Sequence, residues 1–109
     1  RLILADALAY AQKYKPAALI DLATLTGACV TALGTDVAGM MGSDERLMAR
    51  ITKAAESTGE KVWQLPLWEE YGELLKSDIA DLKNVGGRDA GAITDGYFLK
   101  EFAGDAPWV

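Results

Sequence analysis

The sequence predicts an α/β fold with a mainly parallel sheet flanked by helices. Two observations lead to this class. Helical patterns alternate with short apolar runs along the chain, and the run at 17–23 is nearly continuous rather than alternating. A continuous apolar run is typical of a strand that is buried on both faces, as strands of parallel sheets are. Alternation of such strands with helices indicates a parallel sheet covered by helices.

The first half of the chain is expected to alternate between helix and strand. Residues 2–14 form a helix that we predict to be mostly buried, because apolar side chains fill all but one stripe of its circumference. The residue before a proline avoids the α region, so this helix ends at Lys15–Pro16. The further expected elements are a buried strand at 17–23, a turn at 24–27, a short helix at 28–33 that ends at Gly34, and a strand at 36–42.

The second half contains the clearest amphipathic pattern, a helix at 44–58. Ser43 is its expected N-cap, and Gly59 suits the residue after its C-terminal end. The further expected elements are an extended stretch at 62–65, a helix from Pro66 through Lys76, an ambiguous stretch at 79–85, a loop at 86–89, and a helix at 90–103 capped by Asp89 and ended by Gly104.

The absence of histidine limits the chemistry of these 109 residues. It excludes a Ser-His-Asp or Cys-His apparatus and an imidazole metal ligand within the chain. Cys29 is the single cysteine, so no disulfide can form within the chain, and a reducing compartment is compatible with this. We interpret Cys29 as a small core residue.

The net charge of −5 argues against nucleic-acid binding by this segment, because phosphate backbones attract basic patches. No apolar run approaches the roughly 20 residues that span a bilayer, so we expect no contact with a membrane. The chain begins at Arg1 rather than methionine and ends on Pro107–Val109, which has the character of the start of a strand. We therefore expect an internal piece of a longer protein.

The turn from Thr24 to Gly27 is the first candidate binding site. Ligands of open parallel sheets lie beyond the carboxyl ends of the strands, and this turn follows the strongest predicted strand. Its backbone N–H groups can hold an anion or an extended peptide, and Gly27 allows close approach to the main chain. The alternative is an ordinary strand-to-helix loop, in which threonine and glycine serve the turn alone.

Other charged and aromatic residues have two interpretations each. Arg1 can clamp a carboxylate or bicarbonate in a bidentate fork, or it is simply solvated. Asp21 lies inside an apolar run and is expected to face an arginine, a lysine or a backbone amide. The remaining features are interpreted as surface charge (Asp78 and Asp81) and as core or subunit contact rather than a recognition surface (Trp63, Trp68 and Tyr71).

Several ordered motifs resemble one family, the leucyl aminopeptidases. Residues 1–8 are similar to the tail of that family's Asn-Thr-Asp-Ala-Glu-Gly-Arg-Leu signature, and residues 21–28 are similar to its second hallmark. The other matching stretches are 62–67, 80–84, 91–94, 98–102 and 107–109. The resemblance covers essentially the whole chain and identifies it as an internal fragment of the C-terminal catalytic domain.

The resemblance implies a cytoplasmic, metal-dependent exopeptidase that releases N-terminal residues of peptides, leucine above all, and assembles as a homohexamer. Two metal ions, zinc or manganese, polarise the peptide carbonyl and lower the pKa of a bridging water. In the family, carboxylates and a lysine hold the metals and a second lysine acts electrophilically. All of these would precede Arg1, so we expect no metal ligand within the chain and no activity from the chain alone.

The resemblance assigns roles to four residues of this sequence. Arg1 matches the arginine that holds a bicarbonate acting as general base. Leu25 matches the position whose N–H also holds that bicarbonate and whose carbonyl meets the scissile amide. Thr24 and Gly27 match substrate-pocket and backbone-contact positions. Asp95 departs from the family pattern, in which a small residue is usual within that helix.

Two other functions remain open at this point. Some relatives also bind DNA as accessory architectural proteins, and a basic stripe in another part of the protein would favour that role. A non-catalytic relative, or a fragment with only a structural role, is the second alternative.

Overall fold

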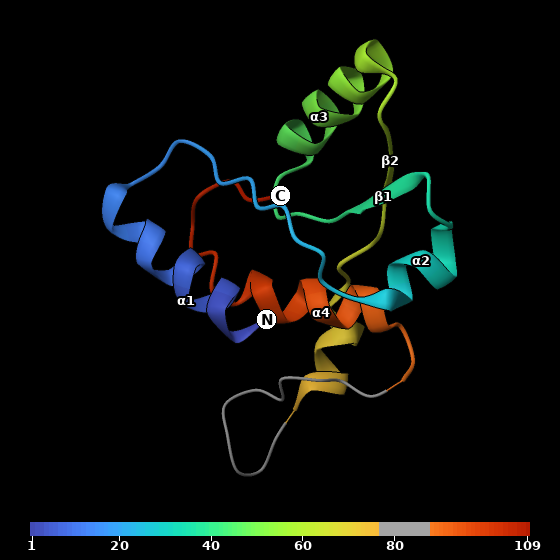
Figure 1. Ribbon diagram of the computed structural model, residues 1–109. Helices are drawn as coiled ribbons and strands as arrows, with labels where there is room; N and C mark the ends of the chain where they lie inside the picture. Colours follow the sequence, from blue (N-terminus) through green and yellow to red (C-terminus); the bar gives the residue numbers. More distant parts are fainter. Residues whose placement is uncertain (77–87) are drawn as a thin grey trace.

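The computed structural model describes residues 1–76 and 88–109, and its two ordered strands lie among several helices (Figure 1). The elements are, in chain order, α1 (Leu2–Ala11), the 3₁₀ helix η1 (Gln12–Tyr14), α2 (Gly27–Leu33), β1 (Val37–Met40), α3 (Glu45–Thr58), β2 (Lys61–Gln64), the 3₁₀ helix η2 (Glu69–Leu75) and α4 (Gly91–Lys100). Three features of the sequence analysis lie outside the described residues: the ambiguous stretch at 79–85, the pair Asp78 and Asp81, and the first half of the loop at 86–89.

Parallel pairing confirms the α/β class. Strands β1 and β2 are parallel, with Val37 opposite Lys61 and Met40 opposite Gln64. A second parallel pairing joins Leu19 to Trp108: the Leu19 N–H donates to the Pro107 carbonyl at 2.7 Å, and the Val109 N–H donates to the Leu19 carbonyl at 3.0 Å. The Ser43 N–H donates to the Trp108 carbonyl at 2.8 Å, so the C-terminal segment lies between the end of the β1 region and residues 19–21.

The prediction of a buried strand at 17–23 is wrong in extent and in burial. The segment pairs only around Leu19, and the side chains of Ile20 and Leu22 are 57% and 92% exposed. An apolar side chain is buried only where another element covers it, and the hydrogen bonds of this segment join it to residues 107–109 along one edge. The predicted strand at 36–42 and the extended stretch at 62–65 are confirmed as β1 and β2.

The first helix covers the predicted residues 2–14, with its last turn in 3₁₀ form, but it is more exposed than predicted. It ends at Ala11, continues as a 3₁₀ turn, and stops where Lys15 adopts a left-handed conformation with φ 46° ahead of Pro16. Only Ala5 and Leu8 of α1 are buried, while Ile3 is 86% exposed. The helix packs against α4 along the side that carries Ala5 and Leu8. Most of its other apolar side chains are not covered, although most of the helix surface is apolar.

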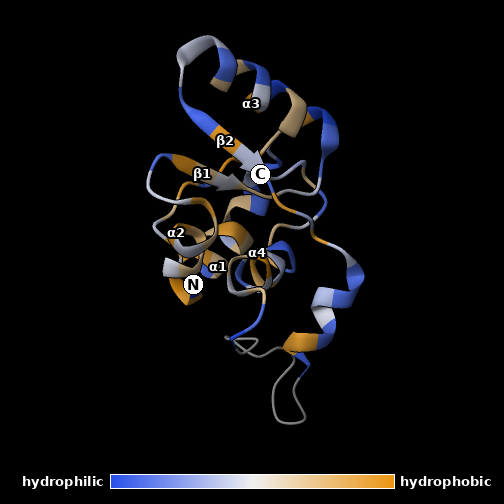
Figure 2. Ribbon diagram, turned by 90° about the vertical axis from the view of Figure 1, so that its right-hand side faces the viewer, coloured by the Kyte–Doolittle hydropathy of each residue, from blue (hydrophilic) through white to orange (hydrophobic). Residues whose placement is uncertain are grey.

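Helix α3 confirms the amphipathic prediction, and hydrophilic and hydrophobic stretches alternate along it (Figure 2). Its N-cap is Asp44 rather than Ser43, because the Asp44 carboxylate accepts from the Leu47 N–H at 2.8 Å. Ser43 instead binds the C-terminal segment, and its hydroxyl accepts from the Trp108 N–H at 3.1 Å. Gly59 ends the helix with φ 77°, as predicted.

The remaining helices differ from prediction mainly at their ends. Residues 69–75 form a 3₁₀ helix instead of the α-helix predicted at 66–76, and Gly72 within it lies against the Tyr97 ring, where a Cβ would come within 2.9 Å. Helix α4 spans ten residues, not 90–103, and begins after Ala90 at φ 52° with no side-chain cap, so the predicted cap at Asp89 is wrong. The short helix at 28–33 is confirmed as α2.

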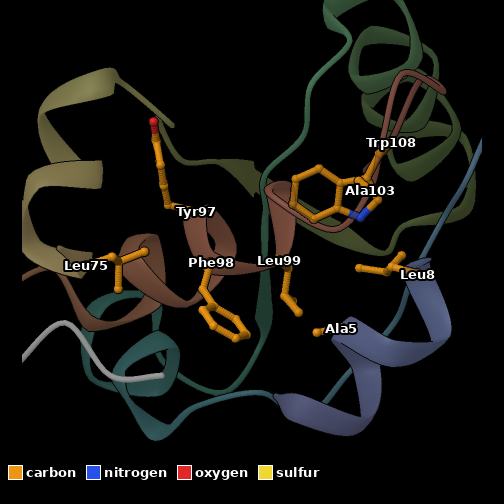
Figure 3. Close-up of a cluster of buried hydrophobic side chains, with 8 residues drawn as sticks. All are labelled: Ala5, Leu8, Leu75, Tyr97, Phe98, Leu99, Ala103 and Trp108. Carbon is orange, nitrogen blue, oxygen red and sulfur yellow. The ribbon is translucent and has the colours of Figure 1, made fainter. Parts of the chain in front are cut away.

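The core is centred on α4, which has seven buried residues in ten. In Figure 3, Leu99 of α4 points toward Ala5 of α1, with Leu8 of the same helix nearby. The cluster is completed by Tyr97 and Phe98 of α4, Leu75 from η2, Ala103 and Trp108. This packing holds the N-terminal end of α1 beside α4, and that placement determines the geometry of the candidate site.

Candidate functional site

The candidate site is built around an ion pair between Arg1 and Asp95. Arg1 is the N-cap residue of α1, and its Nη1 donates to Oδ1 of Asp95 in the middle of α4. The side chain of Arg1 is 24% exposed and that of Asp95 is 4% exposed. The ion pair therefore lies at the edge of the core, with its carboxylate inside and its guanidinium reaching the surface.

Burial is the dominant influence on Asp95 and raises the pKa of its carboxyl above the ordinary value. The positive charge and hydrogen bond of Arg1 act in the opposite direction, as does a hydrogen bond from the Thr26 side chain. A buried carboxylate is costly unless it is paired and hydrogen-bonded, and Asp95 has both kinds of partner.

The turn at 24–27 adjoins this ion pair through Thr26. The Thr26 hydroxyl accepts from the Ala28 N–H at 3.2 Å and thereby caps α2, so Thr26 serves both the helix and the carboxylate. Leu25 packs against the core, whereas Thr24 is exposed. The structure thus brings Arg1 close to the predicted turn, although the two are separated by more than twenty residues in the sequence.

Gly27 is exposed, and a Cβ added to it would meet no atom of the chain within 4 Å. Its φ is not among the positive values of the described backbone, so backbone strain does not explain the glycine. The observation that remains is the open space in front of its main chain, which is what a substrate that approaches the backbone requires.

A cavity of about 350 Å³ lies beside the turn and is largely apolar. Thr24 and Leu25 line it together with Ala38 and Met40 of β1 and with Val109. Arg1 and Gly27 do not line it. The cavity therefore lies between the segment at 20–26, the two strands and α4, and neither Arg1 nor Asp95 lines it.

The structure also bears on the interpretations of Asp21 and of three aromatic residues. Asp21 accepts from the indole N–H of Trp108, a partner that was not among those expected. Trp63 and Trp68 are 65% and 66% exposed, so they do not lie in the core of this chain, and subunit contact stays a prediction for them. Tyr71 packs against the core cluster, as predicted. Trp68 stacks on Tyr71 with ring centroids 6.2 Å apart.

Sequence reasoning identified Asp95 as unusual but assigned it no role. The signal was present, because a carboxylate between Thr94 and Gly96, inside a helix that is otherwise buried, requires a partner of opposite charge. The sequence pattern alone did not identify that partner.

The residues at 1–76 and 88–109 contain no cluster of three or more His, Cys, Asp or Glu side chains that could hold a metal ion. No helix within those ranges is long and apolar enough to cross a membrane. The described part of the chain therefore offers an arginine, a carboxylate, a capped turn and main-chain groups to a ligand.

Comparisons with known proteins identify the family of this chain. The sequence model for the catalytic domain of the cytosol aminopeptidase family matches residues 1–109. A probable cytosol aminopeptidase of Geobacter sulfurreducens is 60% identical over the whole chain, and one of Chlorobaculum parvum is 62% identical over 94% of it.

These relatives are much longer than this chain, which spans 22% and 20% of their lengths. A solved structure of a tomato leucine aminopeptidase mutant superimposes with a TM-score of 0.93 at 46% identity, over 96% of this chain and 21% of that one. By its sequence and its structure, the chain belongs to the cytosol aminopeptidase family.

Proposed function

We propose that this chain is an internal part of the catalytic domain of an aminopeptidase that releases N-terminal residues, leucine preferred, from peptides. The observation that carries the proposal is the match of the family's catalytic domain to all 109 residues. The names of the relatives and of the solved neighbour, cytosol and leucine aminopeptidase, support the peptidase activity, the leucine preference and a cytoplasmic location.

The proposed substrate contacts are Thr24, Leu25 and Gly27, and Arg1 is the proposed catalytic residue. Three features support this assignment: the open space at Gly27, the Thr26 cap of the helix that begins at Gly27, and the shared contact of Arg1 and Thr26 with the Asp95 carboxylate. In this arrangement the main chain of the turn aligns the peptide, and such alignment supplies a large part of catalysis without any reacting side chain. The Arg1 guanidinium, paired with the Asp95 carboxylate, places N–H donors near the turn.

The two metal ions, manganese or zinc, are proposed to be held by residues outside this chain, since its described residues provide no cluster for them. The homohexamer is likewise part of the proposal, and the exposed side chains of Trp63 and Trp68 are surfaces that subunit contact would cover.

The Arg1 guanidinium has an anionic partner in the chain where the resemblance implies bicarbonate. Its Nη1 donates to the Asp95 carboxylate, so a bicarbonate bound through Nη1 would have to displace that carboxylate. We therefore derive no catalytic step through bicarbonate.

The activity is tested with the complete protein that contains this segment. We expect it to hydrolyse leucine p-nitroanilide when manganese or zinc is supplied, and to lose that activity after dialysis against a chelator. A 109-residue chain purified alone should hydrolyse none. A well-folded, metal-loaded complete protein without any aminopeptidase activity would contradict the proposal and favour a non-catalytic relative.

The turn is tested with Gly27→Val in the complete protein. Because the position is open and its φ is not positive, this change should lower kcat/KM at least tenfold while it shifts the melting temperature little. Leu25→Met is the matched control, since its proposed contacts are made by the main chain. Near-parental activity of folded Gly27→Val protein would remove the turn from the substrate site.

A further inference from the structure

We propose that Asp95 is the resident anion of the Arg1 guanidinium, and that this site consequently works without an oxyanion taken up from solution. This inference rests on the proposed function, because it assumes that Arg1 belongs to the active site. Asp95 is a positioning residue in this proposal, since it acts through Arg1.

The first support is that the Arg1 guanidinium already has an anionic partner within the chain. Nη1 of Arg1 donates to Oδ1 of Asp95, and the carboxylate side chain is only 4% exposed. A guanidinium binds a carboxylate and a bicarbonate through the same kind of N–H donors. A bicarbonate that takes Nη1 of Arg1 therefore competes with a carboxylate that is already part of the chain.

The second support is that the Asp95 side chain is held in place. Its neighbours Thr94 and Gly96 are buried within α4, and Gly96 is so close to Met41 that an added Cβ would lie 2.6 Å from the Met41 sulfur. The Thr26 side chain contributes a further hydrogen bond to the carboxylate. Asp95 thus has two polar partners, Arg1 and Thr26, and a side chain that is almost fully buried.

The third support is the cost of displacement. An anion from solution that displaces Asp95 from Nη1 of Arg1 would leave the Asp95 carboxylate buried without its opposite charge, and breaking a buried pair in this way is strongly unfavourable. Asp95 itself loses no translational freedom on pairing, because the packing of α1 against α4 has already placed it. Both effects favour the internal carboxylate over dissolved bicarbonate.

The experiment compares the complete parent enzyme with Asp95→Ala and Asp95→Asn. Initial rates with leucine p-nitroanilide are measured in carbonate-free buffer and across a bicarbonate titration, and melting temperatures are recorded in the same titration. We expect bicarbonate to change the parent's kcat/KM by less than twofold. Asp95→Ala should fall at least tenfold and recover severalfold with bicarbonate, and its melting temperature should rise as bicarbonate is added.

Two controls separate this response from a general effect on the fold. Asp6→Ala removes an exposed carboxylate from α1 and should retain both the parental rate and the parental indifference to bicarbonate. The double change of Arg1 and Asp95 to alanine should lose the bicarbonate response, because the fork itself is gone. If Asp95→Ala does not fold, the nearly isosteric Asp95→Asn takes its place in every comparison.

The proposal is overturned if bicarbonate stimulates the parent as strongly as it stimulates the Asp95 variants, or if neither variant responds to bicarbonate in rate and melting. If the parent shows no aminopeptidase activity at all, the proposed function fails separately. The bicarbonate dependence of melting still decides the Arg1–Asp95 question in that case, since stabilisation of the variants but not of the parent requires no catalysis.

Discussion

Helix α4 and the segment from Pro16 to Thr26 are both rich in apolar residues, yet only the helix is buried. Residues 94–99 of α4 are all buried, because α1, α2 and η2 pack around it. In the segment, Leu22 is 92% exposed, and the main chain pairs along one edge with residues 107–109. The difference shows that hydropathy indicates which side chains would be stabilised by burial. The packing of neighbouring elements determines which of them are in fact buried.

The largest effect is expected from truncating each region at one leucine. Leu99 is 2% exposed, so Leu99→Ala should cost about 2–5 kcal/mol of unfolding free energy. Leu22→Ala should cost less than about 0.5 kcal/mol. Urea titration of residues 1–109 measures both. Equal losses would break the comparison, because they would show that Leu22 is covered as fully as Leu99.

The side chain that joins the segment to the core is Asp21. It accepts from the Trp108 indole, and Trp108 is only 2% exposed. Asp21→Ala leaves that N–H without its partner and should cost about 1–3 kcal/mol. Asp21→Asn keeps an acceptor oxygen and should cost less. If the alanine variant is as stable as the parent in the same titration, the hydrogen bond does not hold the segment in place.

Thr26 tests the end of the segment, where it becomes α2. Removal of its hydroxyl in Thr26→Ala should cost about 1 kcal/mol through the lost N-cap, whereas Thr26→Ser retains the oxygen and should be close to the parent. Thermal melts of the two variants provide the measurement. A serine variant that is as unstable as alanine would indicate that the methyl group, rather than the cap, is what matters.

The smallest expected effect is the pH dependence contributed by Asp95. Burial raises its folded-state pKa above the ordinary 3.8, so the folded protein holds this proton more tightly than the unfolded chain. The resulting stabilisation is complete below pH 3.8 and is lost as the pH rises through the raised value.

Asp95→Asn lacks this proton equilibrium. The melting temperature of the parent, relative to that of the variant, should therefore fall as the pH rises through this window. A relative melting temperature that rises with pH would mean that Arg1 outweighs burial and that the pKa is lowered.

Elements whose chemistry is local could be predicted well. The stripe of α3, its glycine end and the β1 and β2 runs depend on residues within a few positions of one another, and they form as predicted. Several of the wrong predictions concern residues that form hydrogen bonds with residues far away in the sequence. Ser43 is a good N-cap in isolation, but Trp108 engages both its N–H and its hydroxyl, and Asp44 caps the helix instead.

The candidate site divides in the same way. The α/β class, the turn at 24–27 and the family resemblance follow from residue types and short spacings, which any chain with this sequence carries before it folds. The pairing of Arg1 with Asp95 joins residues 94 positions apart, and only the packing of α1 against α4 brings them together. The ion pair matters for stability because the Asp95 carboxylate is buried, and a buried carboxylate is costly unless a positive charge is paired with it.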